Sequence, residues 1–176
     1  TNYRGFASQT FPLSSRVTVI AGINGRGKSS ILDATALLLS NLLPKVTPAA
    51  GGYKYLSDTD IKNGTDSLEI GIQASFEGIP VEYSISKDLG GRQIPTNILK
   101  QVREEILRVY GDPAVATDSA PLAVYYTTDR ASYRLPKKFL EVAPIEQAAA
   151  YRGALVNRQI DYRDFISRFR AWQEQP

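Results

Sequence analysis

Two residue types that carry much of enzyme chemistry are missing from this sequence of 176 residues, which contains no cysteine and no histidine. Without cysteine the chain has no disulfide, no thiol nucleophile and no cysteine-ligated zinc or iron–sulfur site. Without histidine, a Ser-His-Asp triad and histidine metal ligands are excluded as well. Any chemistry must therefore rest on carboxylates, hydroxyls, amines, guanidinium groups or the main chain.

A long hydrophobic run is also absent. The most apolar stretch, Ile31 to Leu43, is interrupted by Asp33, Thr35, Ser40 and Asn41. It is too short and too polar to span a bilayer. No signal peptide opens the sequence, so we expect a cytoplasmic protein without membrane contact. The sequence also lacks methionine, even at position 1, and we therefore expect a segment of a longer gene product.

The overall composition is that of an ordinary folded domain. Hydrophobic residues make up 43% of the chain and charged residues 22%, which argues against global disorder. The formal net charge is only +3. Such a mild excess permits an acidic partner such as DNA or RNA, but a solvated surface explains it equally well.

Hydrophobic patterning predicts a strand and then a helix in the first quarter of the chain. The β-branched run from Arg16 to Ala21 predicts a short buried strand. A helical period begins at Lys28, and Pro44 is expected to end it. The apolar face of this helix is expected to comprise Ile31, Leu32, Thr35, Leu38, Leu39, Leu42 and Leu43.

The middle of the chain predicts a surface loop and an antiparallel hairpin. Residues 49–62 are rich in Gly, Tyr and Asp and predict the loop. Two alternating runs, Leu68–Phe76 and Ile79–Ile85, flank the turn residues Glu77 and Gly78 and predict a hairpin with one wet face. Residues 87–95 are expected to form another loop.

The second half predicts further helices and one more strand. Thr96 is expected to cap a helix that ends before Gly111. The apolar face of that helix should comprise Ile98, Leu99, Val102, Ile106 and Val109. Residues 122–126 predict a second buried strand, and residues 146–175 predict two helices.

The most informative segment is the glycine-rich run from Gly22 to Ser29. Its sequence, Gly-Ile-Asn-Gly-Arg-Gly-Lys-Ser, matches the P-loop pattern G-x-x-x-x-G-K-[ST], with the expected strand before it and helix after it. The glycines let backbone N–H groups close around phosphate oxygens at a helix N-terminus. Lys28 would supply a charge for the β- and γ-phosphates, and Ser29 a hydroxyl for Mg²⁺. The run predicts binding of ATP with Mg²⁺. The residues expected to form this site are Asn24, Gly25, Arg26, Gly27, Lys28 and Ser29.

Two weaker signals each allow two interpretations. Asp129 follows an apolar run and would hold Mg²⁺ or its water if that run were a Walker B strand. Alternatively, Asp129 begins a polar or water-positioning loop. The segment Leu89-Gly-Gly-Arg-Gln93 superficially resembles the LSGGQ signature of ABC ATPases, but its place just after a hairpin favours a surface turn.

Several segments together resemble the N-terminal lobe of RecF/SMC-type ABC ATPases. They are Asn2–Phe6, the P-loop with its continuation to Asp33, and Leu122–Arg130. Within that group the sequence is most similar to AAA-family ATPases of bacterial anti-phage systems, such as the Septu ATPase subunit and its retron-associated relatives. Residues 161–172 are similar to a segment that recurs there. The resemblance covers most of the chain, and the P-loop is its most specific part.

The resemblance implies an α/β fold and a composite site. Residues 1–176 would form one ABC-type head lobe, with a mixed sheet around the P-loop helix, an antiparallel β subdomain and a helical C-terminal part. Two heads would dimerise head to tail, with ATP between the P-loop of one and the signature motif of the other. Ser30 would join the phosphate site and Arg4 would lie close to the nucleotide. Asp129, with Arg130, would fall near a loop where the family has a Gln, which this sequence lacks.

The resemblance also implies a function for the intact protein. The signature motif and main Walker B acids are expected further toward the C-terminus, so this segment alone should be inactive. The intact protein would hydrolyse ATP, form a homodimer or higher oligomer, and control a DNA- or RNA-targeting partner nuclease in anti-phage defence. A RecF/SMC-type genome-maintenance ATPase and a regulatory module without turnover remain open alternatives. A small GTPase-like switch is disfavoured because no N-K-x-D motif is present.

Overall fold

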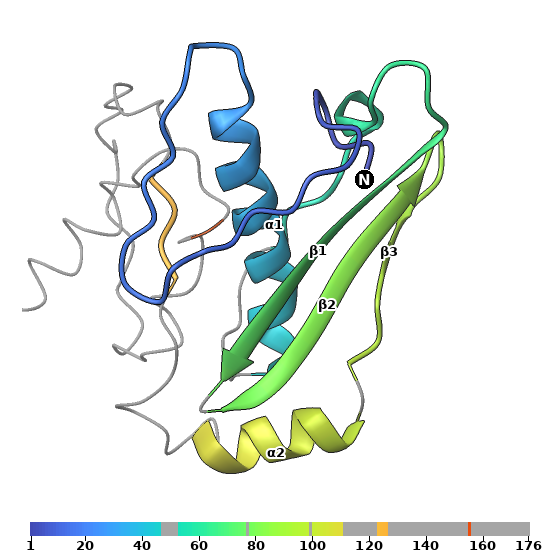
Figure 1. Ribbon diagram of the computed structural model, residues 1–176. Helices are drawn as coiled ribbons and strands as arrows, with labels where there is room; N and C mark the ends of the chain where they lie inside the picture. Colours follow the sequence, from blue (N-terminus) through green and yellow to red (C-terminus); the bar gives the residue numbers. More distant parts are fainter. Residues whose placement is uncertain (47–52, 77, 99, 111–122, 127–154, 156–176) are drawn as a thin grey trace, which may run out of the picture.

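The computed structural model describes residues 1–46, 53–76, 78–98, 100–110, 123–126 and 155. The elements in chain order are α1 (Lys28–Val46), the 3₁₀ turn η1 (Asp58–Asp60), β1 (Ser67–Phe76), β2 (Ile79–Asp88), β3 (Gln93–Pro95) and α2 (Lys100–Tyr110). In Figure 1, α1 runs along one face of the three-stranded sheet, and α2 crosses the end where β1 passes into β2. This arrangement leaves the N-terminus of α1 at the other end.

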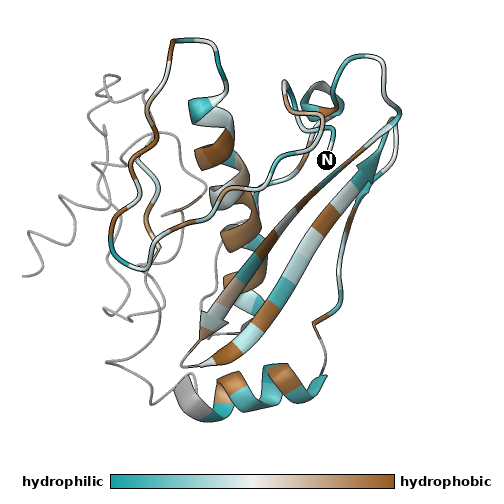
Figure 2. Cartoon of the chain, in the orientation of Figure 1, coloured by the Kyte–Doolittle hydropathy of each residue, from teal (hydrophilic) through white to brown (hydrophobic). Residues whose placement is uncertain are grey.

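The predicted hairpin is confirmed. β1 and β2 pair antiparallel, with Phe76 opposite Ile79 at the turn and Leu68 opposite Lys87 at the far end. Hydrophobic residues alternate with hydrophilic ones along both strands (Figure 2), and the apolar positions are the buried or half-buried ones. Tyr83 and Ile85 on β2 are fully buried there, so this face supplies much of the core against α1.

The predicted loop at 87–95 is wrong at both ends, because β2 continues to Asp88 and a third strand follows. Residues Gln93–Pro95 form β3, which pairs antiparallel with β2, and Lys87 lies opposite Gln93. Leu89 to Arg92 make the turn between the two strands, in which Gly90 has a φ of 71° and the Gly91 N–H donates to the Asp88 carbonyl at 2.9 Å. The surface-turn interpretation of the segment that resembles LSGGQ is therefore confirmed.

Thr96 does not cap α2, contrary to prediction. Its hydroxyl lies 2.6 Å from the Ser84 hydroxyl and 3.0 Å from the Ser84 carbonyl, and its N–H donates to the same carbonyl, so Thr96 extends the pairing of β3 with β2. The helix begins four residues later, at Lys100, and ends at Tyr110 just before Gly111, as expected. Ile106 is its fully buried residue. Sheet pairing has thus overridden a local capping preference.

The P-loop helix begins at Lys28 as predicted, but Pro44 does not end it. Pro44 lies in the last turn, and α1 continues to Val46. Proline has no N–H group, so it removes one hydrogen bond of the helix. Because Pro44 lies in the last turn, the helix can continue to Val46 despite this loss. The predicted apolar face is right for Leu38, Leu42 and Leu43, which are buried, whereas Leu32 is exposed. Burial also extends to Ala36, Leu37, Ser40 and Asn41.

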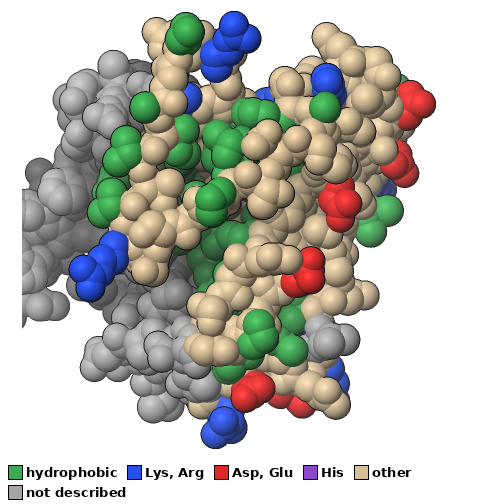
Figure 3. Space-filling model, in the orientation of Figure 1, with side chains coloured by type: hydrophobic (Ala, Val, Ile, Leu, Met, Phe, Trp, Pro, Cys, Tyr) green, Lys and Arg blue, Asp and Glu red, His purple; other side chains and the backbone are tan. Residues whose placement is uncertain are grey.

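Neither of the two predicted buried strands, at residues 16–21 and 122–126, is a strand in its described part. Residues 17–21 carry no strand pairing, and Val17 and Val19 are 74% and 83% exposed. Figure 3 shows hydrophobic side chains on the surface along this segment. Residues 123–126 are likewise without strand pairing, although Ala123 and Tyr125 pack against the core. A buried strand pairs its N–H and C=O groups with a neighbouring strand, and the strand pairings of the described residues do not include either segment.

The predicted loop at 49–62 contributes to the core in its described part. Leu56 and Ile61 are buried, and η1 lies between them. Apart from the buried Leu155, the predicted helices at 146–175 lie outside the described residues, as does the loop at Asp129. Within the described ranges the sheet is antiparallel, so the predicted mixed sheet is not seen there. No helix in these ranges is long and apolar enough to cross a membrane.

Candidate functional site

The glycine-rich loop stands at the N-terminus of α1 and has the backbone that a phosphate cradle needs. Gly25 and Gly27 have φ values of 82° and 89°, in the left-handed region that glycine adopts without strain. The Arg26 N–H donates to the Ile23 carbonyl at 3.3 Å and closes a turn between them. Left-handed residues in such a turn bring successive N–H groups toward one side, where they can bind an anion.

Gly27 also lies against the ring of Phe6. A β-carbon at position 27 would come within 2.6 Å of the Phe6 ring, closer than any real contact of this kind. Phe6 in turn meets Phe11 edge to face, with ring centroids 5.5 Å apart. The N-terminal segment therefore packs directly on the backbone of the loop. Sequence reasoning missed this role of Phe6, because nothing local to Phe6 or Gly27 links them.

Lys28 lies over the mouth of the loop. Its ammonium group donates to the carbonyls of Gly22 and Ile23 at 2.8 and 3.0 Å, and to the side-chain oxygen of Asn24 at 3.4 Å. The side chain thus folds back across the loop instead of extending into solvent. The three acceptors are neutral, so a phosphate oxygen would bind the same ammonium more strongly.

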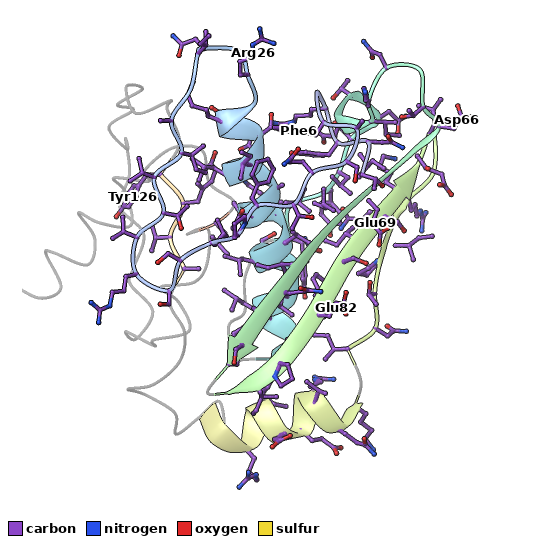
Figure 4. The ribbon with its side chains drawn as sticks, in the orientation of Figure 1. Phe6, Arg26, Asp66, Glu69, Glu82 and Tyr126 are labelled. Atoms are coloured by element: carbon purple, nitrogen blue, oxygen red, sulfur yellow. The ribbon has the colours of Figure 1, made fainter. Side chains whose placement is uncertain are left out.

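The first turn of α1 is electrostatically suited to an anion. It contains no acidic residue, and the unpaired N–H groups of a helix N-terminus carry partial positive charge. Ser29 is exposed in this turn, so its hydroxyl can reach a metal ion beside the loop. Arg26 is also exposed, and Figure 4 places it at the outer tip of the loop.

Arg4 reaches α1 just beyond the loop. One guanidinium nitrogen lies 2.7 Å from Asp33 Oδ2 and 3.4 Å from Ser30 Oγ, and Nε lies 2.9 Å from Asp60 Oδ1. Arg4 therefore borders the predicted site at Ser30, and its charge is shared between two carboxylates. Those contacts raise the pKa of Arg4 against the effect of its partial burial, so it stays charged.

Asp33 accepts a second hydrogen bond from a distant segment. The Tyr125 hydroxyl donates to Asp33 Oδ1 at 2.7 Å, and the Lys54 ammonium lies 4.4 Å from the centroid of the Tyr125 ring. Partial burial opposes ionisation of Asp33. The hydrogen bonds from Tyr125 and Arg4 outweigh that effect, and the pKa of Asp33 lies below its ordinary value. Sequence reasoning did not assign Asp33 or Tyr125 to the site.

The remaining predicted site residue, Asp129, lies outside the described residues. Within the described ranges no group of three or more acidic side chains could hold a metal ion. A hollow of about 450 Å³ exists near the hairpin turn, lined by Gln73, Pro80, Val102 and their neighbours. It lies at the end of the sheet covered by α2 and includes none of the predicted nucleotide-binding residues. The candidate nucleotide site is therefore the loop at the N-terminus of α1.

Two comparisons with known proteins bear on this site. The sequence profile of a family described as the AAA domain matches residues 1–169. The chain is also similar to the Retron Ec83 probable ATPase of Escherichia coli, with 30% identity over 80 residues. That alignment covers 44% of this chain and 15% of the relative, so the similarity spans a small part of the relative's length.

Proposed function

The chain belongs to the AAA domain family, and on this premise we propose that it binds ATP with Mg²⁺ through the loop from Gly22 to Ser29. The observation that carries the proposal is the geometry of the loop. Gly25 and Gly27 adopt left-handed conformations at the start of a 19-residue helix, and the Lys28 ammonium lies across the loop's own carbonyl groups. An anion of high charge is the ligand that such a loop favours.

Each residue of the proposed site has a separate task. The N–H groups of residues 24–30 would surround the phosphate oxygens, and Lys28 would exchange its carbonyl contacts for the β- and γ-phosphates. The Ser29 hydroxyl would hold Mg²⁺, which when bound neutralises charge on the same phosphates. Arg26 adds a positive charge at the tip of the loop, where it would attract the incoming nucleotide.

We further propose that the intact protein hydrolyses ATP as an ABC-type head and controls a nucleic-acid-targeting nuclease in anti-phage defence. The support is the resemblance of the sequence to such ATPases and the similarity to a relative named as the probable ATPase of a retron. In this proposal two heads associate with ATP between them, and a mixed sheet completed by other segments surrounds α1. Asp129 is the candidate to position the attacking water, in a segment outside the described residues.

Binding and turnover are tested separately. A fluorescent ATP analogue is titrated into the intact protein with and without Mg²⁺, and ATP and GTP are compared as competitors. Steady-state phosphate release is then measured. Mg²⁺-dependent ATP binding with phosphate release supports the proposal, whereas binding without release favours a regulatory module. Preference for GTP, or no nucleotide binding at all, would overturn it.

The defence role needs a cellular test. The complete system is expressed in bacteria, and phage infection is compared between the native protein and the Lys28→Ala variant. Lys100→Ala is the matched control, because Lys100 is exposed on α2 and pairs only loosely with Glu104 at 3.5 Å. We expect Lys28→Ala to remove protection and Lys100→Ala to retain it. If the native protein gives no protection, a genome-maintenance role becomes the better proposal.

A further inference from the structure

Asp33 joins three parts of the chain that are distant in sequence. It lies on α1 four residues after Ser29, and each of its carboxylate oxygens has one partner at 2.7 Å. Arg4, 29 positions before it, binds Oδ2, and Tyr125, 92 positions after it, binds Oδ1. Residues four apart lie on the same face of a helix, so Asp33 lies one turn after Ser29 on one face of α1. The contacts of Asp33 with Arg4 and Tyr125 therefore hold the part of the helix next to Ser29.

The Arg4 end of this connection is firmly held. Arg4 has a φ of 49°, which is uncommon for a residue other than glycine, and its own N–H donates to the Asp60 carbonyl at 2.7 Å. Its Nε binds the Asp60 carboxylate, and that carboxylate also accepts from the Ser57 N–H at 2.9 Å. Backbone strain of this kind persists where the surroundings determine it, often beside functional sites.

The charges of this cluster are balanced. Arg4 and Lys54 contribute two positive charges, and Asp33 and Asp60 contribute two negative ones. The Arg4 guanidinium already serves two carboxylates, and it reaches α1 at Ser30 and Asp33. Its geometry therefore fits a role in holding the helix better than a role as a direct phosphate ligand.

We propose that Arg4 and Tyr125 are positioning residues that act through Asp33 to fix the first turn of α1, and with it the Ser29 hydroxyl that holds Mg²⁺. This inference rests on the proposed ATP site. It implies that the network supports the Mg²⁺-dependent part of nucleotide binding more than the part contributed by the loop's N–H groups. It also links the segment 123–126 to the occupancy of the metal site.

The test removes one hydroxyl group from the network. In the intact protein, Tyr125→Phe deletes the donor to Asp33 and keeps the ring beside Lys54. Its neighbour Tyr126 is 70% exposed, so Tyr126→Phe is the matched control. The dissociation constant for ATP is measured with saturating Mg²⁺ and again with EDTA. We expect Tyr125→Phe to weaken binding about tenfold with Mg²⁺, because hydrogen bonds to charged groups are strong, and less than about twofold in EDTA.

Two further variants test whether the effect passes through Asp33. Arg4→Lys keeps the charge but replaces the two separate nitrogens that bind Asp60 and Asp33 with a single one, so it should reproduce the Mg²⁺-specific loss. In an Asp33→Ala background, Tyr125→Phe should cause little additional loss, because alanine leaves no acceptor for the Tyr125 hydroxyl. Melting curves of each variant show whether the fold is kept.

The outcomes separate this inference from the proposed function. If the native protein binds no ATP, the proposed site itself is wrong. If the native protein binds ATP and Tyr125→Phe leaves both constants unchanged, or weakens both equally, the positioning role is overturned while the ATP site stands. Should Asp33→Ala fail to fold, the comparison of Tyr125→Phe with Tyr126→Phe still decides.

Discussion

The Phe6 ring packs against Gly27 so closely that a methyl group on this residue would lie 2.6 Å from it. The contact joins the N-terminal segment to the last glycine of the loop, 21 positions later in the chain. Gly27 therefore combines a left-handed backbone, which favours glycine, with close contact to an aromatic ring that an added side chain would displace.

We expect Gly27→Ala to remove ATP binding and to destabilise the fold. The alanine would adopt an unfavourable φ, at a cost of about 1–2 kcal/mol, and would also displace Phe6. Gly64→Ala is the matched control, because Gly64 has a φ of 85° with nothing within 4 Å of an added β-carbon. Denaturant unfolding and ATP titration measure both effects. Equal loss of stability in the two variants, with ATP affinity retained, would contradict the role of the Phe6 contact.

We expect Lys28→Ala to reduce ATP affinity at least about a hundredfold while the fold is retained. Lys28 is the lysine of the loop, and its contacts in the structure are to the loop's own carbonyls and Asn24, not to the core. Titration with a labelled ATP analogue gives the affinity, and a melting curve checks folding. Lys100→Ala should match the native protein in both measurements. A folded Lys28→Ala variant with native affinity would exclude the loop as the nucleotide site.

Tyr83 offers a test of the core. It is fully buried, and its hydroxyl has no hydrogen-bond partner in the part of the chain that the structure describes. Removing a buried hydroxyl without a partner is neutral or favourable, so Tyr83→Phe should keep or raise stability by up to about 1 kcal/mol at pH 7. Urea unfolding measures this change. A loss of more than 1 kcal/mol would mean that the hydroxyl has a partner.

The same residue predicts a pH dependence. Burial raises the pKa of Tyr83 to about 12, above its ordinary value of 10.0. Between these two values the unfolded chain releases the proton and the folded chain keeps it, so the free energy of unfolding is unaffected by this proton below pH 10 and falls as the pH rises from 10 toward 12. Tyr83→Phe should therefore lose stability less steeply than the native protein over this range. Parallel slopes would show that Tyr83 ionises normally.

We expect ATP to promote self-association of the intact protein, since ligand bound between two heads favours the associated state by mass action. Sedimentation with and without a slowly hydrolysed ATP analogue measures the effect, and Lys28→Ala serves as the control that should not respond. A mass that does not depend on nucleotide would count against heads that close over ATP.

The sequence alone was sufficient to predict the features that depend on the local pattern of residues. The alternation in Leu68–Phe76 and in Ile79–Ile85, with turn residues between them, predicted the hairpin, and a shift of one residue in its pairing would turn the apolar set to solvent. The spacing of Gly22, Gly25, Gly27 and Lys28 identified the loop, and the helical period after it identified α1. These signals arise from backbone geometry and from residues only a few positions apart.

Other features were decided by the tertiary structure, because they depend on residues that meet only after the elements pack. Thr96 became part of the sheet because Ser84 lies beside it. Lys87 alternates into the interior and is only 7% exposed, because Asp58 of η1 lies 2.7 Å from its ammonium group. The contacts of Asp33 with Arg4 and Tyr125 likewise span 29 and 92 positions. A charged residue shows in the sequence that it needs a partner, but the packing of α1 against the N-terminal turn and the segment 123–126 determines which partner it finds.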